Sequence, residues 1–163
     1  NINSQGNQAV GTPLAMRREP RTVVQAQFSI CYNIACALVN GSVRLSDFTQ
    51  EALSRPEILA VAAKVTPVVD PVFEETMGRN VTPARVEALI NGKVMSAQVT
   101  EAKGNFETPM SESDLRIKLE DCLAFGGFSV NRADAFESAI KRLRSSTNVA
   151  ADLRELSNTI SAR

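Results

Sequence analysis

Four polar side chains recur at helical spacing within an otherwise apolar stretch: Gln25, Ser29, Tyr32 and Cys36. In a helix this spacing places all four on one side. Buried polar groups need hydrogen-bond partners, so the stripe either lines a polar cavity or is satisfied within the core. In a cavity, the Tyr32 hydroxyl could donate a hydrogen bond or a proton to a ligand. In the core, it would be tied to a backbone carbonyl. Spacing alone favours the core interpretation but does not exclude the interpretation that the stripe lines a cavity.

Other candidates for chemistry are weaker. Arg17 and Arg18, beside Glu19, could hold a carboxylate through paired hydrogen bonds. Neighbouring charges of this kind are more often solvated on the surface, and we favour that interpretation. The chain contains no His. It therefore lacks the commonest general base and the commonest metal ligand.

Composition restricts the class of protein. The chain has 163 residues, of which 44% are hydrophobic and 22% charged, as in ordinary globular domains. Eighteen basic residues balance eighteen acidic ones, which gives no indication of a nucleic-acid or membrane-surface partner. Three cysteines in no framework spacing favour a reduced, cytoplasmic setting. The chain does not begin with Met, and we interpret it as a fragment of a longer protein.

The first half of the chain is predicted to be mainly helical. Residues 1–20 are polar and predicted to be loop. Val24–Asn40 is predicted to form one helix, buried because it is apolar nearly all round, and Gly41 ends it. Shorter helices are expected over 49–54 and from Pro56 to about Val65.

A β-hairpin is predicted in the second half. Residues 81–102 carry the strand signal: Val86, Ala88 and Ile90 alternate with their neighbours, and apolar residues recur less regularly after the turn until residues 103–105 end the second strand. Asn91-Gly92 between the two runs is typical of a type I′ turn. Two strands do not make a stable sheet alone. Either residues 1–20 and an extended segment at 66–70 pair with the hairpin, or strands upstream of Asn1 are missing.

The C-terminal part is predicted to be helical again. Ser111 with Asp114 resembles a capping box for a helix ending near Phe125. Amphipathic helices follow over 132–144, with Phe136, Ile140 and Leu143 facing inward, and over 149–156. Helices, a hairpin and then further helices indicate an α+β fold.

Residues Ala26–Ala35 read A-Q-F-S-I-C-Y-N-I-A and resemble the A-x-F-S-[IL]-P-Y-x-x-A signature of the MmgE/PrpD family. Cys31 stands where the signature has Pro. Two later segments also resemble motifs of the family. Ala84–Gly92 resembles a strand that runs into an N-G or D-G turn, and Gly104–Leu119 resembles the motif G-x-x-x-x-P-[ML]-S-x-x-[DE]-L-x-x-K-[FL]. The resemblance extends over roughly residues 20 to 125 and is carried by the ordered set of motifs.

The resemblance implies a two-domain enzyme with an all-helical domain and a smaller α+β lid domain. Residues 1–108 would be the later part of the lid, with a small antiparallel sheet and packed helices. Residues 109–163 would be C-terminal helices that pack on the helical domain upstream. The resemblance further implies a cytoplasmic homodimer without metal or other cofactor, and without a nucleic-acid or membrane partner.

The activity implied is that of a 2-methylcitrate dehydratase-like lyase or isomerase acting on small polycarboxylic acids. Its relatives include dehydratases, decarboxylases and epimerases, and their main Asp, His and Lys groups lie upstream of this segment. Of the residues present here, the resemblance assigns Tyr32 to the active-site cleft as a catalytic donor. It assigns Ser29, more weakly, to substrate binding.

Two other interpretations remain open. The chain could be a non-catalytic binding or assembly module of the same fold, or a family member that has lost its activity. Fold resemblance alone fixes neither the substrate nor the choice among dehydratase, decarboxylase and epimerase.

Overall fold

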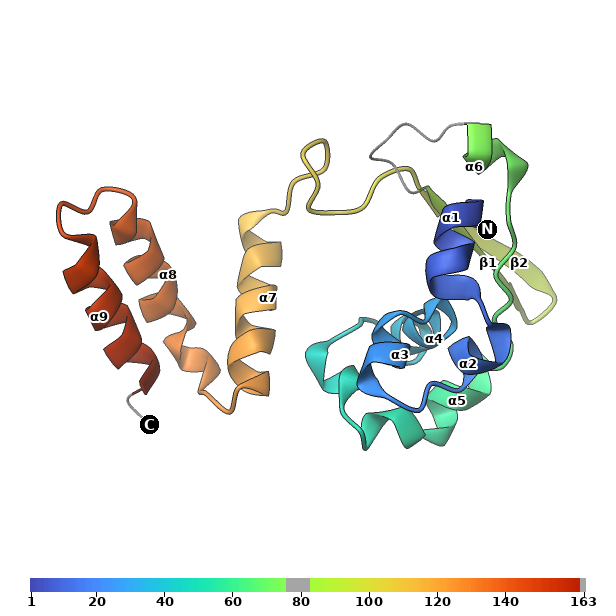
Figure 1. Cartoon of the computed structure of the whole chain (residues 1–163), viewed down its shortest axis with the longest axis horizontal. Coiled ribbons are helices and arrows are strands. Elements are labelled where there is room, and N and C mark those ends of the chain that lie inside the picture. The colour runs from blue at the N-terminus through green and yellow to red at the C-terminus, as the bar shows by residue number, and fades with distance from the viewer. Residues whose placement is uncertain (76–82, 162–163) are drawn as a thin grey trace. The chain divides into compact units, whose positions relative to one another are not determined.

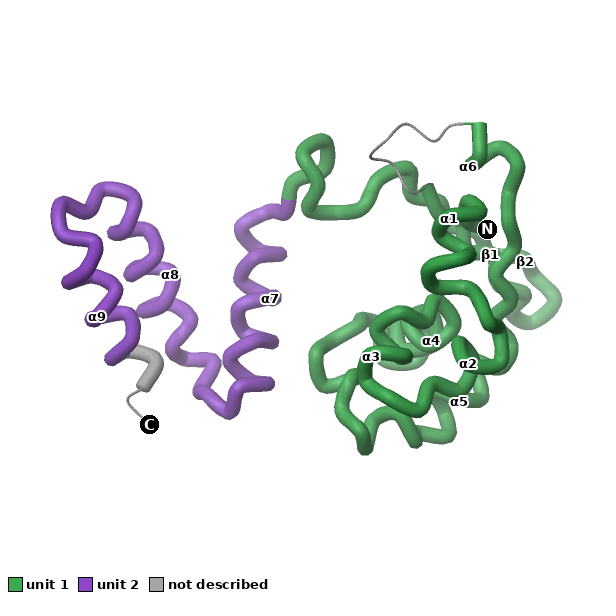
Figure 2. Tube along the Cα trace, viewed as in Figure 1, with its two compact units in different colours: residues 1–109 green, residues 110–163 purple. Residues whose placement is uncertain are grey.

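The computed structural model describes residues 1–75 and 83–161. The chain divides into two compact units, Asn1–Pro109 and Met110–Arg163 (Figure 2). Within the described residues, helices precede and follow one two-stranded antiparallel sheet in the sequence, which confirms the predicted α+β class (Figure 1). Along this part of the chain, no helix has the length and apolar character needed to cross a membrane.

The N-terminal segment is helical, so its prediction as loop was wrong. It contains α1 (Ser4–Gly6), a π-helical turn η1 (Asn7–Gly11) and α2 (Leu14–Arg18). The side chain of Asn3 caps α1 by accepting a hydrogen bond from the Gly6 amide at 2.6 Å. The buried Arg17 guanidinium donates to the carbonyl oxygens of Ala9 and Thr12, each at 2.9 Å. Side-chain hydrogen bonds of this kind supply partners for the free backbone N–H and C=O groups at the ends of short helices. Such helices are too short for the periodicity of the sequence to reveal them.

The predicted helix Val24–Asn40 is two helices, α3 (Val23–Gln27) and α4 (Ile30–Asn40). The break lies at Phe28 and Ser29, where the Ser29 hydroxyl accepts from the Tyr32 amide at 3.0 Å and so caps α4. Gly41 ends α4 with φ 75°, as predicted, because this left-handed conformation favours glycine.

One face of these helices forms the core of the first unit. Tyr32 and Cys36 of α4 pack with Leu53 of η3 (Ala52–Ser54) and Ile58 of α5 (Pro56–Ala62). The prediction that the whole segment is buried was wrong, because Val24 is 63% exposed and Leu38 is 55% exposed. A further short helical turn, η2 (Leu45–Phe48), connects α4 to η3.

The hairpin forms as predicted, from β1 (Ala84–Ile90) and β2 (Lys93–Val99), with Ala84 opposite Val99. Asn91 and Gly92 have φ of 50° and 76°, as a type I′ turn requires. The hairpin does not stand alone. Asn1 pairs with β1, and Ile2 bridges to the 66–70 connector, which leads into α6 (Pro71–Glu75).

The second unit consists of α7 (Glu112–Phe125), η4 (Val130–Arg132), α8 (Ala133–Leu143) and α9 (Val149–Ser161). The predicted capping box is confirmed, since Ser111 Oγ accepts from the Asp114 amide and Asp114 Oδ2 accepts from the Ser111 amide. α9 extends beyond its predicted end.

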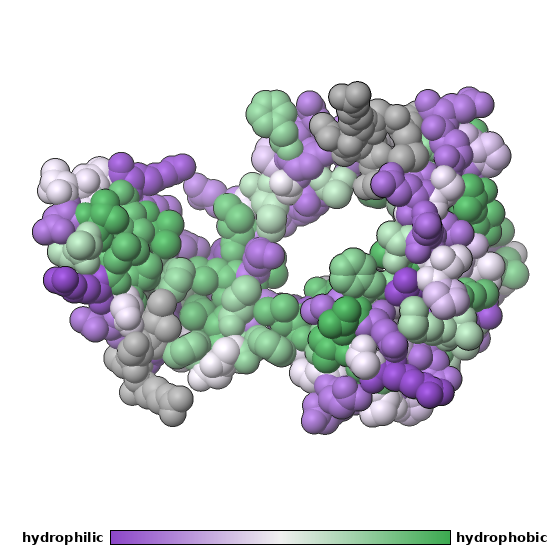
Figure 3. Space-filling model, viewed as in Figure 1, coloured by the Kyte–Doolittle hydropathy of each residue, from purple (hydrophilic) through white to green (hydrophobic). Residues whose placement is uncertain are grey.

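Helix α8 buries a different set of residues from the one predicted. Ala133 and Ala139 are buried, whereas Phe136 and Leu143 are half-buried and Ile140 is 45% exposed. Apolar surface is visible over the α8–α9 end of this unit (Figure 3). The unit therefore retains an uncovered apolar face.

Candidate functional site

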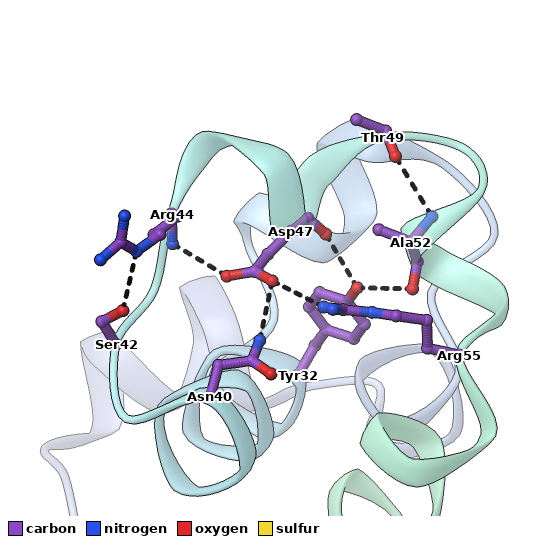
Figure 4. Close-up of polar contacts among 8 residues, drawn as sticks. All are labelled: Tyr32, Asn40, Ser42, Arg44, Asp47, Thr49, Ala52 and Arg55. Carbon is purple, nitrogen blue, oxygen red and sulfur yellow. Dashed lines mark hydrogen bonds and ion pairs between the residues drawn. The ribbon is translucent and has the colours of Figure 1, made fainter. Parts of the chain in front are cut away.

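The residue with the strongest sequence-based assignment, Tyr32, lies at the centre of a buried polar cluster in the first unit (Figure 4). Its ring is fully buried among the core residues of α4. Its hydroxyl lies 2.8 Å from the carbonyl oxygen of Asp47 and 3.1 Å from that of Ala52, and it donates to these acceptors. Tyr32 thus joins α4 to the successive turns η2 and η3.

Asp47 supplies the charge in this cluster and is almost completely buried. Its Oδ1 accepts from Asn40 Nδ2 at 2.9 Å and from Arg55 NH2 at 2.6 Å. Its Oδ2 accepts from the Arg44 amide at 2.9 Å. One carboxylate therefore joins the end of α4, the start of η2 and the residue that precedes α5.

Burial favours the neutral forms of the Tyr32 hydroxyl and the Cys36 thiol by raising the pKa of each. It raises the pKa of Tyr32 to about 12, with a further contribution from the neighbouring Cys36 thiol, while Arg55 acts in the opposite direction. Burial also raises the pKa of Cys36, and the charge of Asp47 adds to that shift. At neutral pH Tyr32 is a protonated donor, so it is suited to giving a proton rather than taking one.

The raised pKa of Tyr32 can be measured directly, because the chain has one Tyr and no Trp. We expect tyrosinate absorbance in the native chain to appear with a midpoint of about 12. In denaturant the midpoint should fall to about 10.

The sign of the shift sets the pH range of the associated stability. A pKa raised by folding stabilises the native state fully below the unfolded value, and this contribution is lost as pH rises through the folded value. The loss should therefore lie between about pH 10 and 12. A native midpoint near that of the denatured chain would show that solvent reaches the hydroxyl.

Ser29, the predicted substrate-binding residue, is buried beside Tyr32. Its hydroxyl donates to the Arg17 carbonyl oxygen and accepts from the Tyr32 amide, so it connects α2 to the start of α4. Gln25 lies on α3 instead, where its Oε1 accepts from the Arg21 amide at 2.8 Å. The structure brings Ser29, Tyr32 and Cys36 together in the core and separates Gln25 from them.

The two arginines considered as a carboxylate clamp have other partners. Besides the backbone bonds of Arg17, Arg18 Nε donates to the Val65 carbonyl oxygen at 3.0 Å and its NH2 donates to Thr66 Oγ1 at 2.9 Å. Both guanidinium groups join segments of the chain. The interpretation of this pair as a solvated surface cluster was therefore wrong for Arg17, which is buried.

Sequence reasoning missed Asp47 and Arg55 as members of the cluster. Asp47 lies in η2 and Arg55 lies between η3 and α5, so the periodicity of a single helix does not relate them. The only signal was local: Asp47 occupies a helix-start position, and Arg55 precedes the Pro that opens α5. In the described part of the chain, no group of three or more Cys, Asp or Glu residues is placed to hold a metal ion.

Comparison with known proteins places this arrangement in a family. No curated protein matches the chain at a significant level. The family model described as the MmgE/PrpD C-terminal domain matches residues 2–145, which include the Tyr32 cluster, the hairpin, α7 and α8. The chain therefore belongs to the MmgE/PrpD family, through its C-terminal domain.

Proposed function

We propose that this chain is the C-terminal portion of a metal-independent lyase or isomerase that acts on small polycarboxylic acids. The observation that carries the proposal is the match to the MmgE/PrpD C-terminal domain over residues 2–145, in a family that contains dehydratases. The sequence has no His to act as general base. We propose that the base of the reaction is supplied by residues outside this chain, as the family resemblance implies.

The reaction class needs a base that removes a proton next to a carboxylate, and an acid that protonates the leaving hydroxyl or the carbanion. Tyr32 has the protonation state of such an acid. Its hydroxyl is hydrogen-bonded to the Asp47 and Ala52 carbonyl oxygens. To contact a substrate, it must break these hydrogen bonds and form one to a substrate oxygen instead. The catalytic role of Tyr32 and the substrate contact of Ser29 thus remain predictions.

The remaining parts of the proposal concern the complete protein. We propose that the first unit belongs to the lid and that the second unit packs on a helical domain through its uncovered apolar face. The complete protein would be a cytoplasmic homodimer that requires no cofactor.

The proposal is tested on the full gene product that contains these residues. The protein is treated with a chelator and incubated in D₂O with 2-methylcitrate, citrate or cis-aconitate, and the reaction is followed by NMR. Deuterium incorporation next to a carboxylate reports the protonation of carbon that ends a decarboxylation or an epimerisation, and in recovered substrate it reports reversal of a dehydration. Forward dehydration is reported by the alkene product, because the proton is lost to solvent. We expect incorporation or product with at least one substrate. Absence of both with all three, or activity abolished by the chelator, contradicts the proposal.

One observation favours a second candidate, a non-catalytic binding or assembly module. The polar groups that the family resemblance assigns to a site, Tyr32 Oη and Ser29 Oγ, are bonded to backbone carbonyls within the chain. Such a module would show no proton exchange in the D₂O experiment, and its Tyr32 variants would lose stability only.

A further inference from the structure

The sequence contains two Asn-Gly pairs, Asn40-Gly41 and Asn91-Gly92. All four residues are exposed, and each glycine is in the left-handed conformation, with φ of 75° at Gly41 and 76° at Gly92. Asn is a chemically labile residue, and a glycine after it lets other groups approach the backbone closely because it has no Cβ. Sequence and exposure therefore do not distinguish the two pairs, whereas their contacts do.

Asn40 is held by the polar cluster around Tyr32. It is the last residue of α4, and its Nδ2 donates to Asp47 Oδ1 at 2.9 Å (Figure 4). The same oxygen accepts from Arg55 NH2 at 2.6 Å, and the Asp47 side chain is almost completely buried. The side-chain amide of Asn40 is thus bound to a fixed carboxylate, and its backbone belongs to a helix that packs in the core.

Asn91 lies at the tip of the β1–β2 hairpin and is much less restrained. Its φ of 50° and the pairing of Ile90 with Lys93 define the two-residue turn. The Asn91 side chain makes no hydrogen bond to any residue that the structure describes. The next cross-strand pair, Leu89 with Val94, is exposed to solvent, at 74% and 71%. No buried contact therefore holds the tip in place within the described part of the chain.

The exposure of the hairpin makes its tip easy to open. Every residue of β2 is exposed, and segments with few buried apolar contacts open at a free energy well below that of global unfolding. A two-stranded hairpin is also marginally stable in water. When the turn opens, the backbone of Asn91 is free to rotate, and the Gly92 nitrogen can reach the side-chain carbon Cγ of Asn91.

We propose that Asn91 is a site of spontaneous covalent modification, and that the Asp47 cluster protects Asn40 from the same reaction. The Gly92 nitrogen gives its proton to water or hydroxide and bonds to Cγ of Asn91, and the bond from Cγ to Nδ2 breaks. Nδ2 takes a proton from solvent and leaves as ammonia. Water then adds to one of the two carbonyl carbons of the cyclic imide, which reopens as aspartate or as isoaspartate.

Either product changes the hairpin. Aspartate adds a negative charge at the tip. Isoaspartate inserts the side-chain methylene into the main chain, so the turn becomes longer by one backbone atom and no longer fits the pairing of Ile90 with Lys93 that a type I′ turn fixes. The modification therefore loosens the pairing of β1 with β2 from its tip.

The test incubates the full gene product that contains these residues in mildly alkaline, oxygen-labelled water and locates modified residues by peptide mass spectrometry. We expect Asn91 to be modified at least about tenfold faster than Asn40 in the native protein, because local opening frees Asn91 and leaves Asn40 held. In denaturant the two pairs should react at similar rates, since a glycine follows each Asn.

Three results would overturn the proposal: an Asn91 that stays unmodified in the native protein, equal native rates at the two pairs, or a difference that persists in denaturant. The last would show that the neighbouring sequence, and not the structure, sets the rates.

Two matched variants test the role of opening. Val94→Gly removes a cross-strand side chain beside the turn and weakens β2, so modification of Asn91 should become faster while Asn40 is unchanged. Val149→Gly makes the same change at an exposed valine of the second unit and should leave Asn91 at its original rate. Equal rates at Asn91 in the two variants would contradict the control of the reaction by the hairpin.

Discussion

Replacing Asp47 with Ala is expected to lower the free energy of unfolding of the first unit by about 3 kcal/mol. The substitution removes the acceptor for Asn40, Arg55 and the Arg44 amide at once. Removing one partner of a buried ion pair costs ~3–5 kcal/mol. The Arg55 side chain is 32% exposed, so water partly replaces the lost carboxylate and the lower end of that range applies. Urea unfolding of wild type and variant measures the difference.

A matched control is Glu51→Ala, which removes an exposed carboxylate from the same region of the chain. It should change stability by no more than about 0.5 kcal/mol. If Asp47→Ala were as mild as this control, the carboxylate would not hold η2, α4 and Arg55 together in solution.

Replacing Tyr32 with Phe is expected to lower the free energy of unfolding by ~1–3 kcal/mol. Phe retains the ring but leaves the Asp47 carbonyl oxygen without the Tyr32 donor, whereas the Ala52 carbonyl oxygen keeps its bond from the Arg55 amide. The expected range is the cost of leaving a buried acceptor unsatisfied. The predicted catalytic role adds a second effect in the complete enzyme. Loss of a donor used in the transition state lowers turnover ~100- to 1000-fold.

The two effects are separated by measuring turnover and the unfolding midpoint on the same Tyr32→Phe preparation, with turnover corrected for the folded fraction. Ser54→Ala is the control, because it removes an exposed hydroxyl that donates to the Glu51 carbonyl oxygen nearby. Turnover equal to that of the control, with a lowered midpoint, would remove the catalytic role and leave Tyr32 as a structural residue.

Local chemistry made part of the fold predictable. Asn91 and Gly92 specify a turn that few other residues accommodate, and Ser111 with Asp114 satisfies the first amides of α7 by itself. Gly41 takes a left-handed conformation that penalises side chains. In each case the determining interactions lie within a few residues of one another, so a single sequence contains them.

Side-chain hydrogen bonds that leave no periodic pattern in the sequence explain the errors in the helices. The break between α3 and α4 depends on Ser29 bonding to Arg17, twelve residues away, which periodicity within the apolar stretch does not reveal. The helical form of residues 4–18 depends on side-chain caps from Asn3 and Arg17 to backbone groups. The apolar composition of Val24–Asn40 predicted more burial than the structure shows, because composition does not tell which face of α4 packs against the core.

The candidate site was predictable to the same limited degree. Helical spacing correctly placed Tyr32 and Cys36 together. The interpretation of Tyr32 as a core residue expected its hydroxyl to bond to a backbone carbonyl, and the structure shows such bonds to Asp47 and Ala52. Asp47 and Arg55 could not be associated with it, because their proximity depends on how η2 and α5 fold back over α4.

The proposal that this chain is the C-terminal portion of an enzyme whose general base lies outside it makes a direct prediction about the chain alone. It is tested most directly by assaying purified residues 1–163 alone against 2-methylcitrate, citrate and cis-aconitate. We expect no turnover above the uncatalysed rate, because the proposed general base lies outside these residues and no His is present to replace it. Turnover well above that rate, abolished by a substitution within this chain such as Tyr32→Phe, would contradict it.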